Sequence, residues 1–233
     1  MNLDRIFLSE SHPCGKELRY VQHALEAKAI TSGGNVVRDF EEDLECYLGN
    51  NVIVNATNSG TSAIHLGLLL LGVKPGDEVI CQSMTFSASV NPILYIGASP
   101  VFVDSELDTW NMCPIALEEA IQDRISKGKK PKCIIVVDLY GMPYHADRIN
   151  EVANKYGIAV LEDSAEALGS RYKGVPCGTL GDIGVFSFNG NKIITTSSGG
   201  ALLLSDASQK ERAAFLATQA RDAAPYYQHS EIG

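Results

Sequence analysis

Short apolar runs that alternate with helix-like stretches are the feature that most constrains the fold of this 233-residue chain. The stretches between them repeat apolar residues with a helical period. The turn residues Pro75, Gly76 and Asp77 separate the first of these stretches from the second apolar run. Strands alternating with helices indicate βαβ units, so we expect an α/β fold with a mostly parallel sheet flanked by helices. The predicted strands are 52–55, 78–81, 100–104, 133–138, 159–163, 184–188 and 201–204, and the predicted helices are 60–71, 86–96, 114–126 and 147–156.

Two amphipathic helices, expected at 15–28 and 36–48, come before the first strand. We therefore divide the chain into an N-terminal helical segment (1–50), an α/β domain (51–220) and a polar, irregular ending (221–233). Hydrophobic residues make up 45% of the chain and charged residues 20%, which is enough apolar material for a sizeable core.

A lysine lies between the last two predicted strands. Residues 181–192 read GDIGVFSFNGNK, an apolar run that opens into a glycine-rich loop ending at Lys192. An amine that is fixed and partly desolvated there loses its proton easily and can form a Schiff base with an aldehyde. A surface lysine at a hairpin tip would give the same pattern, so both interpretations stay open.

An acidic residue ends the buried run at 157–163, which reads GIAVLED. Ligands of open α/β sheets bind just beyond the carboxyl ends of the strands. A carboxylate at that place, Asp163, can pair with a protonated pyridine nitrogen, which is what a pyridoxal ring requires. The alternative is that Asp163 caps a helix over 164–168.

The segment 52–63 reads VIVNATNSGTSA, which predicts a strand, a small polar turn and a helix that begins near Gly60. The free N–H groups and the positive dipole end of such a helix suit a phosphate. No lysine follows the glycine and G-x-G-x-x-G is absent, so a nucleotide-binding loop of either kind is not indicated. An ordinary helix cap would show the same residues.

Four segments in the same order resemble the DegT/DnrJ/EryC1/StrS family of nucleotide-sugar aminotransferases, which depend on pyridoxal phosphate. They read NSGTSA at 58–63, MTFSA at 84–88 and EDSAEALG at 162–169, followed by the lysine segment at 181–200. The resemblance runs from about Phe7 to the last residue. It implies the large, cofactor-binding domain of the type I aspartate-aminotransferase fold. In that family the region after 221 leads into a loop and a smaller C-terminal domain, so we expect a truncated chain that lacks them.

The resemblance assigns a role to each candidate residue. Lys192 is the expected catalytic residue, which joins the cofactor covalently and later moves a proton. Asp163 pairs with the pyridine nitrogen, and Phe86 stacks on the ring unless it packs in the core. The remaining implied cofactor ligands surround the phosphate and are Gly60, Thr61 and the hydroxyl of Ser187, which could instead be an ordinary strand residue.

Glu166 departs from the commoner family pattern. Many members have Gln there, and that Gln hydrogen-bonds the phenolic oxygen of the cofactor ring. A carboxylate beside a phenolate is repelled unless it is protonated or bridged by water. We therefore expect Glu166 to be a cofactor ligand that is either protonated when the cofactor is bound or turned away from the ring.

The implied reaction is amino transfer from glutamate to a keto sugar carried on a nucleotide. The loop 189–196 most resembles enzymes that aminate a UDP-4-keto-6-deoxy-N-acetylhexosamine to a 4-amino sugar. Alternatives are a 3-keto or GDP-sugar aminotransferase of the same family, and a pyridoxal phosphate-binding remnant without turnover. A sugar dehydratase would replace Lys192 with His, and a nicotinamide enzyme would need G-x-G-x-x-G.

Charge and composition exclude other classes. The net charge of −9 argues against a nucleic-acid partner, and no apolar run reaches the length of a membrane span. The six cysteines are scattered singly, which is typical of reduced cytosolic thiols, and the five histidines show no metal-ligand spacing. We expect a cytoplasmic enzyme without a metal, and by resemblance a homodimer.

Overall fold

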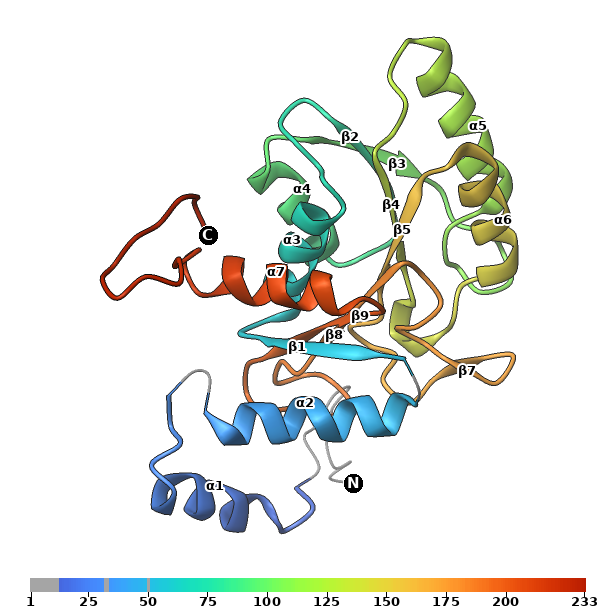
Figure 1. Cartoon of the computed structure of the whole chain (residues 1–233). Helices are drawn as coiled ribbons and strands as arrows, with labels where there is room; N and C mark the ends of the chain where they lie inside the picture. The colour runs from blue at the N-terminus through green and yellow to red at the C-terminus, as the bar shows by residue number, and fades with distance from the viewer. Residues whose placement is uncertain (1–12, 32–33, 50) are drawn as a thin grey trace, which may run out of the picture.

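The computed structural model describes residues 13–31, 34–49 and 51–233. A seven-stranded sheet is built from β1 (Ile53–Thr57), β2 (Glu78–Gln82), β3 (Ser99–Val103), β4 (Cys133–Val137), β5 (Ala159–Asp163), β8 (Ile183–Ser187) and β9 (Gly200–Leu204). The strand order is β1-β9-β8-β5-β4-β2-β3 (Figure 1). β8, β5, β4, β2 and β3 are parallel, and β9 runs antiparallel to both of its neighbours, β1 and β8. The expected mostly parallel α/β sheet is confirmed.

Helices cover both faces of this sheet (Figure 1). α3 (Gly60–Leu70), α4 (Asn91–Tyr95) and α7 (Ala207–Ala217) share one hydrophobic core with it. α5 (Pro114–Ser126) and α6 (Ala146–Tyr156) pack on the opposite face. α2 (Asn35–Leu48) packs on β1, β8 and β9, so it belongs to the same layered body. α1 (Glu17–Glu26) buries none of its residues.

Side-chain alternation along β5 decides which residues reach which core. Leu161 packs with α3, and Val160 packs with α5 and α6. Because successive strand residues point to opposite faces, Asp163 lies on the α3 side and Glu162 on the other. Both acids are buried, so each needs partners within the fold.

The predicted strands all exist, with ends that differ by at most two residues. The single helix expected at 86–96 is wrong. A short 3₁₀ helix, η1 (Ser87–Ser89), comes first, and α4 starts at Asn91 with Pro92 in its first turn. Proline has no N–H to continue a helix from 86 onward, and it is well suited to a first turn.

The helix considered for 164–168 does not form either, and turns occupy that stretch. The hairpin of β6 (Arg171–Tyr172) and β7 (Val175–Pro176), and α7, were not expected. The expected helical segment at 1–50 contains α1 and α2, and its residues 1–12, 32–33 and 50 lie outside the described residues. Across the described ranges, no helix combines the length and apolarity that a membrane crossing requires.

Candidate active site

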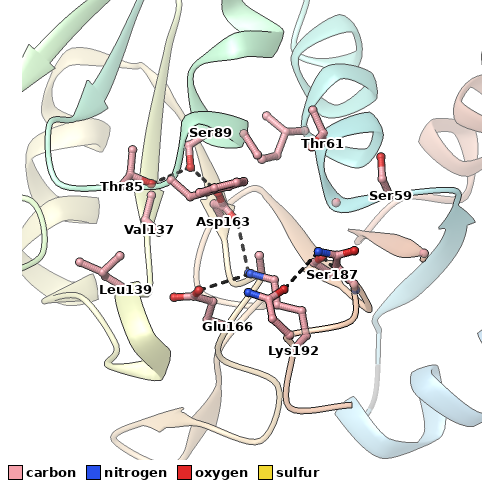
Figure 2. Close-up of a pocket in the computed structure, with 18 of the residues that line it drawn as sticks. Ser59, Thr61, Thr85, Ser89, Val137, Leu139, Asp163, Glu166, Ser187 and Lys192 are labelled. Atoms are coloured by element: carbon pink, nitrogen blue, oxygen red, sulfur yellow. Dashed lines mark hydrogen bonds and ion pairs between the residues drawn. The ribbon is translucent and has the colours of Figure 1, made fainter. Parts of the chain in front are cut away.

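A cavity of about 390 Å³ lies where β1, β5 and β8 end (Figure 2). The seven predicted cofactor ligands come from separate parts of the sequence. The structure brings all of them to the cavity wall. The predicted residues that line it are Gly60, Thr61, Phe86, Asp163, Glu166, Ser187 and Lys192.

The start of α3 forms one end of the cavity. Ser59 caps the helix, and its Oγ accepts a hydrogen bond from the Ser62 N–H at 3.1 Å. The N–H groups of Gly60 and Thr61 have no carbonyl to bond within the helix. A side chain at Gly60 would bring its Cβ to 2.9 Å from Ser187 Cβ, so only glycine lets this helix start lie against β8. The arrangement is a ready anion site.

Lys192 lies in the loop that joins the antiparallel strands β8 and β9. The lysine does lie in a hairpin, but the alternative of a surface lysine is wrong, because the side chain is only 11% exposed and points into the cavity (Figure 2). The loop is fixed by hydrogen bonds from Lys192 N to Asn189 O (2.9 Å) and from Thr196 N to Phe188 O (3.0 Å). It is also tied to the start of α3, because Ser198 Oγ donates to Asn58 O at 2.7 Å.

Asp163 ends β5 with a side chain that is almost completely buried, at 4% exposure. Its Oδ2 accepts from Ser89 Oγ at 2.6 Å and its Oδ1 accepts from the Ala165 N–H at 3.2 Å. Burial and the negative charge of Glu166 raise the pKa of this carboxyl, while the two hydrogen bonds and the positive charge of Lys192 oppose that rise. The helix that Asp163 could have capped does not exist, so that alternative is wrong.

Glu166 connects the lysine to a strained turn. Its Oε1 lies 3.3 Å from Lys192 Nζ and its Oε2 accepts from the Tyr140 N–H at 2.8 Å. Tyr140 has a φ of 53°, a left-handed backbone that tyrosine rarely adopts. The carboxylate therefore holds this turn against the amine, and a role toward the cofactor ring stays a prediction.

Phe86 and Ser187 were each given an ordinary alternative. The Phe86 ring is 71% exposed and lies outside the hydrophobic cores, so core packing is wrong for it. Ser187 is half-buried at the end of β8, and its Oγ accepts from the Asn189 N–H at a long 3.4 Å. Both side chains are therefore available to a ligand in the cavity.

Sequence reasoning missed two hydroxyl residues beside Asp163. Ser89 donates to its carboxylate, and Thr85 lies 2.7 Å from Ser89 Oγ. Thr85 and Ser89 are four residues apart in a polar segment, and nothing in that spacing marks a site. The signal that could have found them is Asp163 itself, because a buried carboxylate requires donors from another element.

A buried polar cluster also lies on the other face of the sheet. Asp138, Glu162 and Cys177 place an oxygen or sulfur ligand atom within 4.8 Å of one another. A second group, Glu106, Asp108 and His145, does so near the surface. Each group brings together residues that are far apart in the sequence, so no local metal-binding motif marks it. The carboxylates of Glu162 and Glu106 already accept several backbone N–H hydrogen bonds.

The model of the DegT/DnrJ/EryC1/StrS aminotransferase family matches residues 14–233. The chain belongs to this family. EpsN of Bacillus subtilis, named as a candidate pyridoxal phosphate-dependent aminotransferase, is 52% identical over 229 residues, which are 98% of this chain and 59% of EpsN. A GDP-perosamine synthase of Escherichia coli O157:H7 is 42% identical over 221 residues, 94% of this chain and 58% of that protein.

Solved structures agree with this assignment to the family. The PLP-form of Spr1654 from Streptococcus pneumoniae, named as a candidate sugar aminotransferase, superposes with a TM-score of 0.87 at 31% identity. The match covers 97% of our chain and 61% of Spr1654. The aminotransferase fold is therefore confirmed, and the chain spans about three fifths of the length of these relatives.

The residues around the cavity fit the cofactor on which this family depends. A helix start with unpaired N–H groups suits its phosphate, and a buried carboxylate suits its ring nitrogen. A mostly buried amine suits its aldehyde. The close approach of Gly60 to Ser187 and the burial of Asp163 are the observations of this structure that support the fit.

Proposed function

We propose that this chain binds pyridoxal phosphate in the cavity and serves an enzyme that transfers the amino group of glutamate to a nucleotide-linked keto sugar. The observation that carries the proposal is the position of Lys192. Its amine is 11% exposed, pairs with Glu166 at 3.3 Å and shares one cavity with Asp163 and the start of α3. When bound, the cofactor supplies an aldehyde that takes up an amino group and a ring that withdraws electrons.

The anion end of the site is formed by the chain's own backbone. The N–H groups of Gly60 and Thr61, with the hydroxyl groups of Ser59 and Ser187, would hold a phosphate at the positive end of the α3 dipole. Asp163 would face the ring nitrogen at the opposite end, where burial strengthens a charge pair. The exposed ring of Phe86 would cover the face of the cofactor that is open to solvent.

Lys192 and Glu166 would handle the proton. When Nζ carries no proton, it can accept one from a carbon of the substrate. The Oε1 atom of Glu166, 3.3 Å away, stabilises Nζ when it carries that proton. Because Oε2 is fixed by the Tyr140 N–H, Glu166 cannot swing away without giving up a hydrogen bond.

Covalent trapping tests this proposal. The chain is incubated with pyridoxal phosphate and reduced with borohydride, and its mass and tryptic peptides are measured beside Lys192→Ala. We expect one cofactor added per chain, on the peptide that contains Lys192, and none in the variant. Lys210→Ala is the matched control, since Lys210 pairs with Glu41 outside the cavity. Labelling that is equal in wild type and Lys192→Ala would contradict the proposal.

The sugar nucleotide is the finer part of the proposal. A UDP-4-keto-6-deoxy-N-acetylhexosamine remains our first candidate because of the loop at 189–196. A GDP sugar is the second candidate, since two relatives named GDP-perosamine synthase are 42% and 41% identical to this chain. Rates with both sugars, measured with ¹⁵N-glutamate as donor, decide between them. Labelling of Lys192 without turnover of either sugar would favour a binding role alone.

A homodimer is also proposed rather than shown. The observation that supports it is α1, which buries none of its residues and exposes Leu18, Val21 and Leu25. Sedimentation of the chain with and without cofactor measures the state directly, and a single monomeric species in both conditions would contradict it.

A further inference from the structure

Two hydroxyl groups connect the cavity wall to the carboxylate of Asp163. Thr85 Oγ1 lies 2.7 Å from Ser89 Oγ, and Ser89 Oγ lies 2.6 Å from Asp163 Oδ2 (Figure 2). Thr85 and Ser89 both line the cavity, and Ser89 is only 1% exposed. Ser89 ends η1, so the short 3₁₀ helix that replaces the expected long helix is what carries this hydroxyl to β5.

The chemistry of the three groups fixes the direction of these two hydrogen bonds. An ionised carboxylate only accepts hydrogen bonds, so Ser89 must be the donor to Asp163. A hydroxyl has one proton, so Ser89 can then only accept from Thr85. Thr85 is therefore the donor to Ser89, and both hydroxyl protons point toward Asp163. Such a chain polarises each donor and strengthens the bond at its end.

Asp163 needs this support because its surroundings favour the neutral acid. Burial and the negative charge of Glu166 raise the pKa of the carboxyl, and the hydrogen bonds from Ser89 and Ala165 and the charge of Lys192 oppose that rise. A neutral Asp163 would lose its attraction for a positively charged ring nitrogen. The Ala165 N–H is the longer of its two hydrogen bonds, at 3.2 Å against 2.6 Å.

We propose that Thr85 and Ser89 form a directed hydroxyl relay that holds Asp163 ionised and fixes its rotamer for pairing with the cofactor nitrogen. The proposal rests on the proposed function for its ligand. Ser89 is a positioning residue that acts through Asp163, and Thr85 acts through Ser89. Neither residue takes part in the transfer of the amino group.

The relay predicts a graded series of variants. Ser89→Ala removes the donor to Asp163, and Ser89→Thr keeps a hydroxyl at the same place. Thr85→Val keeps the shape of Thr85 but removes only the outer hydroxyl. Ser87→Ala is the matched control, because Ser87 begins the same 3₁₀ helix, is exposed and lies outside the cavity.

The first measurement follows the Asp163 carboxyl in the cofactor-free chain, by ¹³C NMR of aspartate labelled at the side-chain carbon. We expect Ser89→Ala to raise its pKa by about one pH unit, which matches the loss of one charge-assisted hydrogen bond. Thr85→Val should raise it by less. Ser89→Thr and Ser87→Ala should titrate as wild type does. An unchanged titration in Ser89→Ala would overturn the relay.

The second measurement is the dissociation constant of pyridoxal phosphate, from fluorescence titration of each variant. We expect roughly 10-fold weaker binding for Ser89→Ala, a smaller loss for Thr85→Val and no loss for Ser87→Ala. Equal binding by all variants would also overturn the relay. If the wild-type protein binds no cofactor, the proposed function fails. The NMR titration needs no cofactor, so it still tests whether Ser89 and Thr85 keep Asp163 ionised.

Discussion

Asp138 and Glu162 face each other across one hydroxyl group, since Ser164 Oγ lies 2.6 Å from Asp138 Oδ2 and 3.1 Å from Glu162 Oε1. Both acids are fully buried, on the side of the sheet away from Asp163. Glu162 also accepts the N–H groups of Gly178, Leu180 and Gly181, at 2.6, 2.7 and 3.0 Å. Burial raises the pKa of Glu162, and those three donors oppose that rise. Burial and the charge of Glu162 raise the pKa of Asp138 well above its usual range.

Asp138→Asn should therefore remove a pH dependence from the free energy of unfolding. The folded state keeps a proton on Asp138 that the unfolded chain loses near pH 4, so wild-type stability falls as pH rises from there. The fall amounts to about 1.4 kcal/mol per pH unit for one proton. Asparagine supplies a permanent donor toward Glu162. Urea unfolding between pH 4.5 and 8 should show the variant gaining on wild type as pH rises, and parallel curves would contradict this assignment.

Glu162→Gln should destabilise the folded protein. An amide has only one oxygen, so its NH₂ group must face N–H donors of the 178–181 loop that now bond to Glu162. We expect a loss of about 1–3 kcal/mol in the free energy of unfolding at pH 7. Chemical denaturation measures it, and a variant as stable as Asp138→Asn would show that the proton is not held on Asp138.

Arg124→Met should destabilise the start of β2. Arg124 binds Glu78 with two hydrogen bonds of 2.7 Å each, and the Glu78 side chain is only 7% exposed. This contact lowers the pKa of Glu78, so its stabilisation is present above the ordinary pKa of a glutamate and is lost as pH falls through the lowered value.

We expect Arg124→Met to cost about 1–3 kcal/mol at pH 7, because Glu78 would keep only the longer contact to Lys129 at 3.5 Å. The cost should shrink below pH 4, as Glu78 becomes neutral. Lys127→Met is the control, since its ion pair with Asp123 is exposed to solvent and contributes little to stability. Equal losses in the two variants would contradict the prediction.

Asn111→Ala should loosen one wall of the cavity. Asn111 is fully buried, its Oδ1 accepts from the Leu139 N–H at 3.1 Å, and its Nδ2 donates to Met142 O at 2.7 Å. Removing the amide leaves two backbone groups unpaired, at a cost of more than ~2 kcal/mol. Thermal unfolding and hydrogen exchange at Leu139 test this, with exposed Asn154→Ala as control. Unchanged exchange at Leu139 would count against it.

Gly60→Ala should weaken binding of pyridoxal phosphate by tenfold or more. The new Cβ would lie 2.9 Å from Ser187 Cβ, so α3 must move away from β8 and take its N–H groups with it. The dissociation constant is the measurement. Gly190→Ala, whose Cβ meets nothing within 4 Å, should bind as wild type does. Wild-type affinity in Gly60→Ala would show that this close approach does not shape the anion site.

The parts of the fold that rest on burial were predictable from the sequence. Short apolar runs rich in β-branched residues, such as 133–137, indicate interior strands, and Asp163 and Lys192 stand out because each lies at or just after the end of such a run. Glu162 carried a signal that was not used. A glutamate inside a fully buried strand requires several donors, and the structure supplies them from the loop at 178–181.

Features that depend on tertiary contact were not predictable. Ser89 is one hydroxyl among several between 83 and 89, and only the 3₁₀ turn decides that it meets Asp163. α7 has a weak apolar pattern, and its stability comes from packing against α3 and β1. Its start was nevertheless visible, since Asp206 caps it and Gln209 follows three residues later, as in a capping box.

The antiparallel pairing of β1 with β9 has a consequence for the order in which this protein can fold. Ile53 pairs with Leu204 and Thr57 with Gly200, so β1 can pair only after a strand much later in the sequence has been synthesised. Contacts so distant in sequence form slowly, and an unpaired strand edge is open to wrong partners until then. The start of α3 follows β1 and lies against Ser187 of β8, so its position depends on strands that are distant in the sequence.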